Sequence, residues 1–165
     1  MRTAVYSGSF NPLHIGHLAI MKHLTGKGGY DCVRLIVSPK NPLKDSISSS
    51  SGTERYNAAK EAVGRHFPES GKVTVDDIEL NMPEPHYTIR TLDELKKQHP
   101  ADTFTLVIGS DNLADIRRWK DYSRILSEYG VLVYPRSGFD TDAIKTDLLE
   151  EDPSYRIEIL EAELV

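Results

Sequence analysis

Cysteine is nearly absent from this chain, since Cys32 is the only one among 165 residues. A disulfide within the chain is therefore excluded, which fits a reducing compartment and predicts a cytoplasmic location. Because Cys32 lies in the apolar run "CVRLIV" (32–37), we expect it to be a small core residue rather than a reactive thiol.

Long hydrophobic runs and excess positive charge are missing as well. No window approaches the roughly 18 apolar residues of a membrane span, and "MRTAVYSGS" has too short an apolar run for a signal peptide. The net charge of −5 argues against broad binding to nucleic acid backbones or anionic membranes. We therefore expect no nucleic-acid partner and no membrane partner.

The apolar residues that are present fall into short runs separated by longer amphipathic stretches. Nearly continuous apolar runs are typical of parallel strands buried on both faces. They occur at 3–7, 32–37, 104–109 and 130–135, and two more polar strands are expected at 72–80, near a sheet edge, and at 156–160. At 165 residues the chain fits one domain, residues 1–165.

Helical stretches lie between these runs. The expected helices cover 14–24, 54–63, 87–99, 121–128 and 140–149, with Thr53 capping the second and Thr88 or Thr91 the third. Strands that alternate with helices predict an α/β fold, a Rossmann-like open parallel sheet with helices on both faces. The serine-rich segment 44–54 is read either as a plain surface loop or as a lid.

The stretch "SGSFNPLHIGH" (7–17) runs from the first expected strand into the first expected helix. In open α/β sheets, ligands bind beyond the carboxyl ends of the strands. Gly8 permits a tight turn and a close approach of the backbone, and Pro12 suits a helix start. The first helical turn then offers free N–H groups and the positive end of the helix dipole, so we expect an anion site here.

Two histidines occupy that first turn. His14 and His17 are three residues apart and share one helix face, with Gly16 between them removing bulk. Imidazoles at a helix N-terminus resist extra positive charge until an anion arrives. A zinc pair and two buried structural histidines are the alternatives, although no third ligand has suitable spacing for zinc. A pair that handles phosphates is the favoured hypothesis.

These residues resemble those of a known family. "SGSFNPLHIGH" is similar to the G-[ST]-F-x-P-x-H-x-G-H signature of the nucleotidyltransferase superfamily. The later motifs resemble those of bacterial nicotinate-nucleotide adenylyltransferases, in the same order along the chain. They are "SPKNPLK" (38–44), "YTIRTL" (87–92), "GSDNLADIRRW" (109–119) and "PRSG" (135–138). The resemblance implies the nucleotidyltransferase type of α/β fold.

It also implies a reaction and a set of site residues. Such an enzyme transfers the adenylyl group of ATP to nicotinate mononucleotide, giving deamido-NAD and pyrophosphate, with Mg²⁺ accompanying ATP. By resemblance, His14 and His17 are catalytic and hold the ATP phosphates. The other ATP-binding residues would be Gly8, Ser9, Phe10, Gly109, Asp111 and Asn112. The mononucleotide would meet Lys44, Tyr87, Thr88, Trp119 and Arg136. No protein ligand for the metal is named.

Several of these residues also have ordinary structural explanations. Trp119 either packs structurally or stacks on an aromatic ligand. Thr88 is either a simple helix cap or part of a carboxylate receptor at a helix start. Lys44 and Arg136 are either surface cations or phosphate ligands at the carboxyl edge of the sheet.

Two rival functions stay open, and the largest departure from the family pattern lies at the end of the sequence. A phosphopantetheine adenylyltransferase has the same fold, and a nucleotide-binding protein without catalysis would keep the pocket. The family continues into an I-S-[ST]-T-x-x-R segment that also grips phosphates, whereas here "RIEILEAELV" (156–165) ends the sequence. We expect that segment to lie beyond Val165. The sequence leaves the oligomeric state and the preference for acid or amide mononucleotide open.

Overall fold

The computed structural model describes residues 1–8, 10, 15–39, 52–68, 72–83 and 86–160. Contacts divide the chain into two compact units, unit 1 over Met1–His86 and unit 2 over Tyr87–Ala162. The single domain expected from the chain length stays a prediction.

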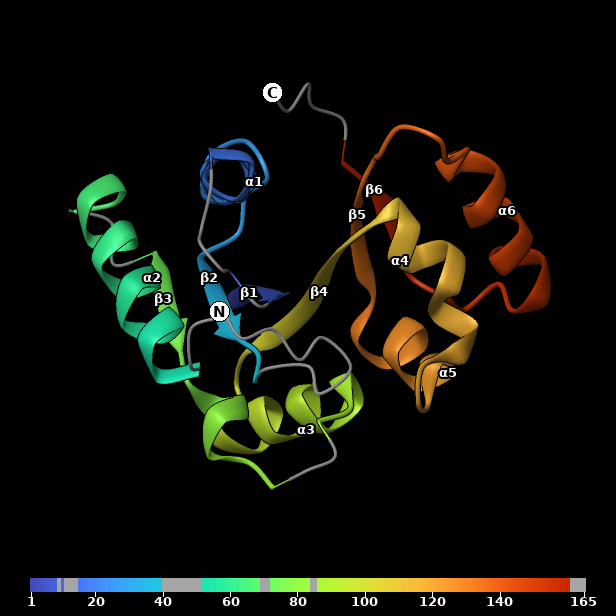
Figure 1. Ribbon diagram of the computed structural model, residues 1–165. Helices are drawn as coiled ribbons and strands as arrows, with labels where there is room; N and C mark the ends of the chain where they lie inside the picture. The colour runs from blue at the N-terminus through green and yellow to red at the C-terminus, as the bar shows by residue number, and fades with distance from the viewer. Residues whose placement is uncertain (9, 11–14, 40–51, 69–71, 84–85, 161–165) are drawn as a thin grey trace, which may run out of the picture. The chain divides into compact units, whose positions relative to one another are not determined.

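Unit 1 is built on three parallel strands. Its elements are β1 (Arg2–Gly8), α1 (Ile15–Thr25), β2 (Cys32–Val37), α2 (Gly52–His66), β3 (Val73–Asp76) and the 3₁₀ helix η2 (Ile78–Asn81). β2 pairs with β1 on one side and with β3 on the other, and α2 runs beside β3 (Figure 1). Gly8 lies opposite Val37, so β1 and β2 end at the same edge.

The core of unit 1 consists of the apolar runs identified in the sequence. β2 is buried along nearly its whole length, as expected for a strand covered on both faces, and Cys32 is buried within it. Met21 and Leu24 of α1 are completely buried, whereas Leu18 on the same helix is only half-buried. The other fully or nearly fully buried apolar side chains of unit 1 are Ala4, Val5, Val33, Leu35, Ile36, Val37 and Ala59.

β3 is shorter than the strand expected over 72–80. It ends at Asp76, whose carboxylate accepts a hydrogen bond from the Ile78 amide at 2.9 Å. The same carboxylate forms an ion pair with Arg34 of β2 at 2.8 Å. The bond to Ile78 turns the backbone away from the strand, and η2 follows. The prediction that this strand lies near an edge is confirmed, because β3 ends the strand order.

The start of α2 differs from the sequence-based expectation. The helix begins at Gly52, so Thr53 lies inside it, and the prediction that Thr53 caps a helix starting at 54 is wrong. A Cβ at position 52 would lie 2.7 Å from Cδ2 of Leu80. Glycine therefore allows the first turn of α2 to pack closely against η2.

Unit 2 also has three parallel strands, in the order β4-β5-β6. Its helix α6 packs against β6 and α4 (Figure 1). The elements are α3 (Thr88–Gln98), β4 (Thr103–Gly109), α4 (Ser110–Asp115), the 3₁₀ helix η3 (Ile116–Arg118), α5 (Tyr122–Arg124), the π-helical turn η4 (Ile125–Tyr129), β5 (Val131–Tyr134), α6 (Thr141–Glu151) and β6 (Ile157–Ile159).

The helices of unit 2 follow the sequence pattern unevenly. The apolar stripe of α3 is confirmed, since Ile89, Leu92 and Leu95 are all buried. Residues 110–118 form α4 and η3, which the sequence analysis did not anticipate. The helix expected over 121–128 is a short α-helical turn followed by the π-helical turn η4.

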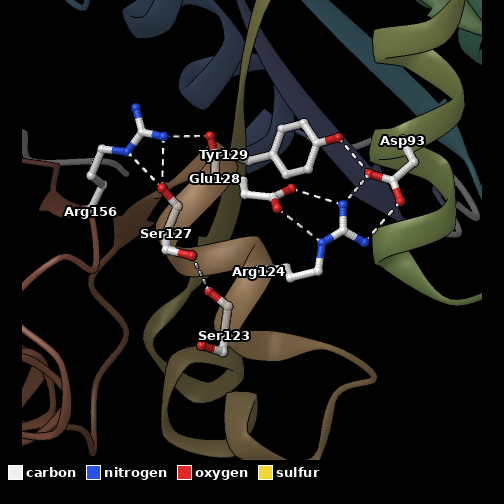
Figure 2. A network of polar contacts seen from close by, with 7 residues as sticks. All are labelled: Asp93, Ser123, Arg124, Ser127, Glu128, Tyr129 and Arg156. Atoms are coloured by element: carbon white, nitrogen blue, oxygen red, sulfur yellow. Dashed lines mark hydrogen bonds and ion pairs between the residues drawn. The ribbon is translucent and has the colours of Figure 1, made fainter.

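A network of polar contacts ties α3 to the segment that precedes β5 (Figure 2). Asp93 of α3 accepts two hydrogen bonds from Arg124, at 3.0 and 3.1 Å, and one from the Tyr129 hydroxyl at 2.6 Å. Arg124 also donates to Glu128, and Arg156 donates to the carbonyls of Ser127 and Glu128. These contacts hold α3, which carries Tyr87 and Thr88 at its start, against η4.

The predicted α/β class is confirmed, because each unit alternates helices with parallel strands. Among the residues that the structure describes, no helix is long and apolar enough to cross a membrane.

Candidate functional site

The carboxyl end of β1 is shaped by a close contact between Gly8 and an aromatic ring. A Cβ at position 8 would lie 3.1 Å from Cζ of Phe10, so a larger residue would push the ring away. Phe10 itself has φ of 46°, in the left-handed region, and its side chain is buried. The sequence analysis assigned the tight turn to Gly8, but the left-handed residue is Phe10.

The Phe10 ring in turn contacts His17, in the first turn of α1. The two ring centroids are 4.9 Å apart, with the ring planes 84° apart. Tyr6 of β1 lies edge-on to both rings, with centroids 5.5 Å from Phe10 and 6.0 Å from His17. Edge-to-face packing of this kind fixes ring orientation. A half-buried imidazole is thereby held beside the end of β1, at the helix start where the sequence predicts an anion site.

In unit 2 the end of β4 is equally crowded. A Cβ at Gly109 would lie 2.6 Å from Oδ1 of Asp111, 2.9 Å from Tyr134 and 3.0 Å from Cδ of Arg136. A larger residue at 109 would force these side chains to shift. Without a side chain at 109, Asp111 of α4, Tyr134 of β5 and Arg136, which follows β5, gather around the backbone at the carboxyl end of β4.

Among the residues around Gly109, Asp111 has a buried carboxylate oxygen, Oδ1, that lacks a hydrogen-bond partner among the described residues. A buried acceptor without a partner costs about 1–3 kcal/mol, which a ligand that donates a hydrogen bond would recover. Asp111 lies in the first turn of α4, directly after β4.

Ser110 was missed by the sequence analysis. Its side chain is fully buried, and its hydroxyl accepts a hydrogen bond from the Arg136 amide at 2.6 Å. The bond joins the chain after β5 to the start of α4, so Arg136 lies near Gly109. The sequence gives no signal for this role, because it depends on a backbone group 26 residues away.

The remaining predicted residues of unit 2 lie at the starts and ends of helices. Tyr87 is 45% exposed and is the N-cap residue of α3, with no side-chain capping bond. The prediction that Thr88 or Thr91 caps this helix is wrong, since Thr88 is its first residue and Thr91 is buried within it. Trp119 is half-buried at the end of η3, and Asn112 lies half-buried in α4.

Three predicted site residues, Ser9, His14 and Lys44, lie outside the described residues, as does most of the serine-rich segment 44–54. Within each unit, the structure brings Gly8, Phe10 and His17 together, and likewise Gly109, Asp111 and Arg136.

Unit 1 also has a groove of about 910 Å³ that is separate from these residues. It lies between α1 and the end of α2, and Ile15 beside it is 74% exposed. The groove is lined by Ile15, Leu18, Ala19, Lys22, Thr25, Gly26, His66, Phe67, Pro68 and Lys72. None of the predicted site residues is among them, so we do not assign the nucleotide to it.

Comparison with known proteins identifies the family. A family model described as cytidylyltransferase-like matches residues 5–158. The chain belongs to the cytidylyltransferase-like family. The match covers nearly all of both units and includes every predicted site residue.

Two curated relatives of this chain share a name. A probable nicotinate-nucleotide adenylyltransferase of Bacteroides fragilis (strain YCH46) is 42% identical over 141 residues, 86% of this chain and 68% of the relative. A protein of the same name from Flavobacterium psychrophilum is 35% identical over 165 residues, 100% of this chain and 81% of the relative.

Solved structures share the fold of this cytidylyltransferase-like protein. Plasmodium falciparum nicotinic acid mononucleotide adenylyltransferase, complexed with NaAD, has a TM-score of 0.79 and 21% identity. The match covers 98% of this chain and 76% of that one. A putative nicotinate-nucleotide adenylyltransferase from Vibrio parahaemolyticus has a TM-score of 0.65 at 21% identity, covering 94% of this chain and 86% of that one. The nucleotidyltransferase type of α/β fold is therefore confirmed.

Proposed function

We propose that this protein transfers the adenylyl group of ATP to nicotinate mononucleotide, releasing pyrophosphate and forming deamido-NAD. The observation that carries the proposal is the similarity of the whole chain, at 35% identity over 165 residues, to a protein named for this reaction. The site geometry supports it independently, because polar groups and crowded glycines gather at the carboxyl ends of β1 and β4.

In unit 1, the proposed ligand is the phosphate chain of ATP. Gly8, Ser9 and Phe10 supply backbone at the end of β1, and His14 and His17 donate to phosphoryl oxygens. The support for His17 is its place in the first turn of α1, where the positive end of the helix dipole favours an anion. As negative charge develops on the departing pyrophosphate, the imidazoles stabilise it.

In unit 2, the proposed ligands are the nucleoside of ATP and the mononucleotide. The buried Oδ1 of Asp111 is an acceptor suited to a ribose hydroxyl, with Gly109 and Asn112 beside the adenosine. Tyr87 and Thr88 offer backbone donors at the start of α3 to the nicotinate carboxylate, and Trp119 stacks on the pyridine ring. Arg136 neutralises the mononucleotide phosphate. Lys44, which lies outside the described residues, is assigned to the same phosphate by the family resemblance alone.

The chemistry needs no covalent intermediate. An oxygen of the mononucleotide phosphate is already anionic at neutral pH and attacks the α-phosphorus of ATP. The new bond joins that oxygen to the α-phosphorus, and the bond from the α-phosphorus to the bridging oxygen breaks. The electron pair of that bond leaves with pyrophosphate. No general base is required, because the attacking oxygen carries no proton. The protein contributes in-line positioning and neutralises charge.

A divalent metal is implied by the family, and we propose Mg²⁺. Among the residues described, no group of three or more His, Cys, Asp or Glu side chains is placed to hold a metal. The polar groups at the proposed site are backbone amides, imidazole and a single carboxylate. Because Mg²⁺ prefers oxygen ligands, this set fits a metal bound mainly by phosphate oxygens and water. When bound, Mg²⁺ neutralises the phosphates, and we name no protein ligand for it.

The test is pyrophosphate release with ATP and Mg²⁺, offering nicotinate mononucleotide, nicotinamide mononucleotide or phosphopantetheine in parallel. We expect release with the nicotinate form, well above the amide, because an acid suits the start of α3. Release only with phosphopantetheine would contradict the proposed substrate while leaving the fold intact. ATP binding without release from any acceptor would favour a protein that binds nucleotide without catalysis.

A further inference from the structure

Arg55 is one of two charged side chains buried among the described residues, the other being Glu79. Only 3% of its surface is exposed, and it lies near the start of α2, whose other buried residues are Ala59 and Val63. Removing a guanidinium from water is costly, and the burial lowers its pKa below the usual value. A buried arginine therefore needs a compensating contact.

One such contact is with the backbone directly after β2. Nη1 of Arg55 donates a hydrogen bond of 2.7 Å to the carbonyl of Ser38. The Ser38 amide donates to the carbonyl of Gly8 at 2.8 Å, and the Ser38 and Ser7 hydroxyls lie 3.3 Å apart. A charge-assisted bond from α2 thus fixes the end of β2, which is itself bonded to the end of β1.

Gly8 is the residue on which the phosphate half of the site is assembled. The Phe10 ring packs against it, and that ring contacts the imidazole of His17. A displacement of Ser38 would move the Gly8 carbonyl and then the surface on which Phe10 lies. The path from Arg55 to His17 consists of two hydrogen bonds and two packing contacts, all within unit 1.

We infer that Arg55 is a positioning residue for the ATP phosphates, acting through Ser38 and Gly8. It is too deeply buried to touch the nucleotide, so its effect is on the geometry of β1 and its following turn. The inference rests on the proposed function of that turn. Lysine is a weaker substitute, because its single ammonium group lacks the rigid planar fork of arginine.

The test compares Arg55→Met with Arg65→Met. Methionine keeps an unbranched stem of similar length, and Arg65 is an exposed residue in the last turn of the same helix. Rates are measured while ATP and mononucleotide are varied separately, at a temperature where circular dichroism shows each variant folded. We expect kcat/KM for ATP to fall roughly 10- to 100-fold for Arg55→Met, with KM for the mononucleotide nearly unchanged. Arg65→Met should match wild type.

A purely structural role for Arg55 predicts a different pattern. Arg55→Met would then unfold at a lower temperature but show normal kinetics for both substrates while folded, and that result would overturn the inference. If Arg55→Met does not fold, Arg55→Lys is titrated with ATP by calorimetry. Weakened binding supports the inference, since lysine keeps the charge but not the geometry, and wild-type affinity overturns it.

The wild-type protein separates this inference from the proposed function. If wild type neither binds ATP nor releases pyrophosphate, the proposed function fails, and the positioning role falls with it. If wild type turns over and Arg55→Met behaves like Arg65→Met, only the positioning role is wrong.

Discussion

The Phe10 ring lies edge-on to the His17 imidazole, with ring centroids 4.9 Å apart and planes 84° apart. Phe10 adopts a left-handed backbone conformation to reach this position, which is unfavourable for a large residue. Such strain persists only where the surroundings enforce it. The arrangement therefore links the turn after β1 to the orientation of the proposed catalytic imidazole.

The first prediction concerns the aromatic contact. Phe10→Leu keeps an apolar side chain at this buried position but removes the ring edge that faces His17. We expect kcat/KM for ATP to fall by roughly 2- to 13-fold, because about 0.5–1.5 kcal/mol of aromatic pair energy no longer orients the imidazole. Phe139→Leu is the control, since Phe139 is 43% exposed. Equal kinetics in the two variants would show that the Phe10 ring does not orient His17.

The second prediction concerns the crowded end of β4. In Gly109→Ala the new Cβ would lie 2.6 Å from Oδ1 of Asp111, so the carboxylate must move. We expect ATP binding, measured by calorimetry, to weaken by about 10-fold or more, corresponding to at least ~1.4 kcal/mol. Retained affinity would argue that Asp111 does not hold the nucleoside.

The third prediction concerns Gly64→Ala, the matched control for Gly109→Ala. This variant should change stability and not ATP binding. Gly64 lies within α2, and a Cβ there would meet no atom within 4 Å. Gly64→Ala should raise the free energy of unfolding by about 0.5–1 kcal/mol, because alanine loses less backbone entropy in a helix. Urea denaturation measures this, and activity should not change. A destabilised Gly64→Ala would be inconsistent with the open space at this position.

The fourth prediction concerns pH and the polar network of Figure 2. Partial burial raises the pKa of the Asp93 carboxyl, but hydrogen bonds from Arg124 and Tyr129 outweigh it and bring the pKa below its usual value. A depressed carboxyl pKa contributes stability that is complete above the unfolded pKa, about 3.9. That stability is lost as pH falls through the folded pKa.

Asp93→Asn should therefore lower Tm at pH 7, and its difference from wild type should shrink only as pH falls below about 4 and through the lowered pKa of Asp93. Both side chains of the Asp93–Arg124 pair are almost half exposed, at 43% and 44%, so solvent screens them and we expect about 1 kcal/mol at most. For a chain of this length that corresponds to a Tm change of roughly 2–4 °C. A Tm difference that stays constant from pH 7 to pH 3 would show that the Asp93 charge does not stabilise the fold.

The strands were the most predictable part of the fold. Runs such as "CVRLIV" are apolar on both faces because a parallel sheet buries both, and β2 coincides with that run. β3 was overestimated because Asp76 ends it through a bond from the Ile78 amide, and the Asp76 carboxylate is itself paired with Arg34, which is distant in sequence. The helix α4 was missed because six residues are too few to show a period.

The site was predictable where a motif carried it. The sequence motifs located Gly8 and Gly109. They did not show that Gly8 makes room for the Phe10 ring and Gly109 for the Asp111 carboxylate, because these contacts form only in the folded protein. Ser110 and Arg55 left no trace in the sequence analysis, because their partners are backbone groups of residues far along the chain. Burial of a polar side chain is visible only in the folded protein.

The central claim is that this protein makes deamido-NAD with His17 acting on the phosphates. The most direct measurement is the rate of deamido-NAD formation by His17→Ala, compared with His23→Ala at the other end of α1. We predict that His17→Ala loses roughly 100- to 1,000-fold in kcat while staying folded, the effect of removing one donor to a developing charge. His23→Ala should be unaffected. Equal rates in the two variants would contradict the account.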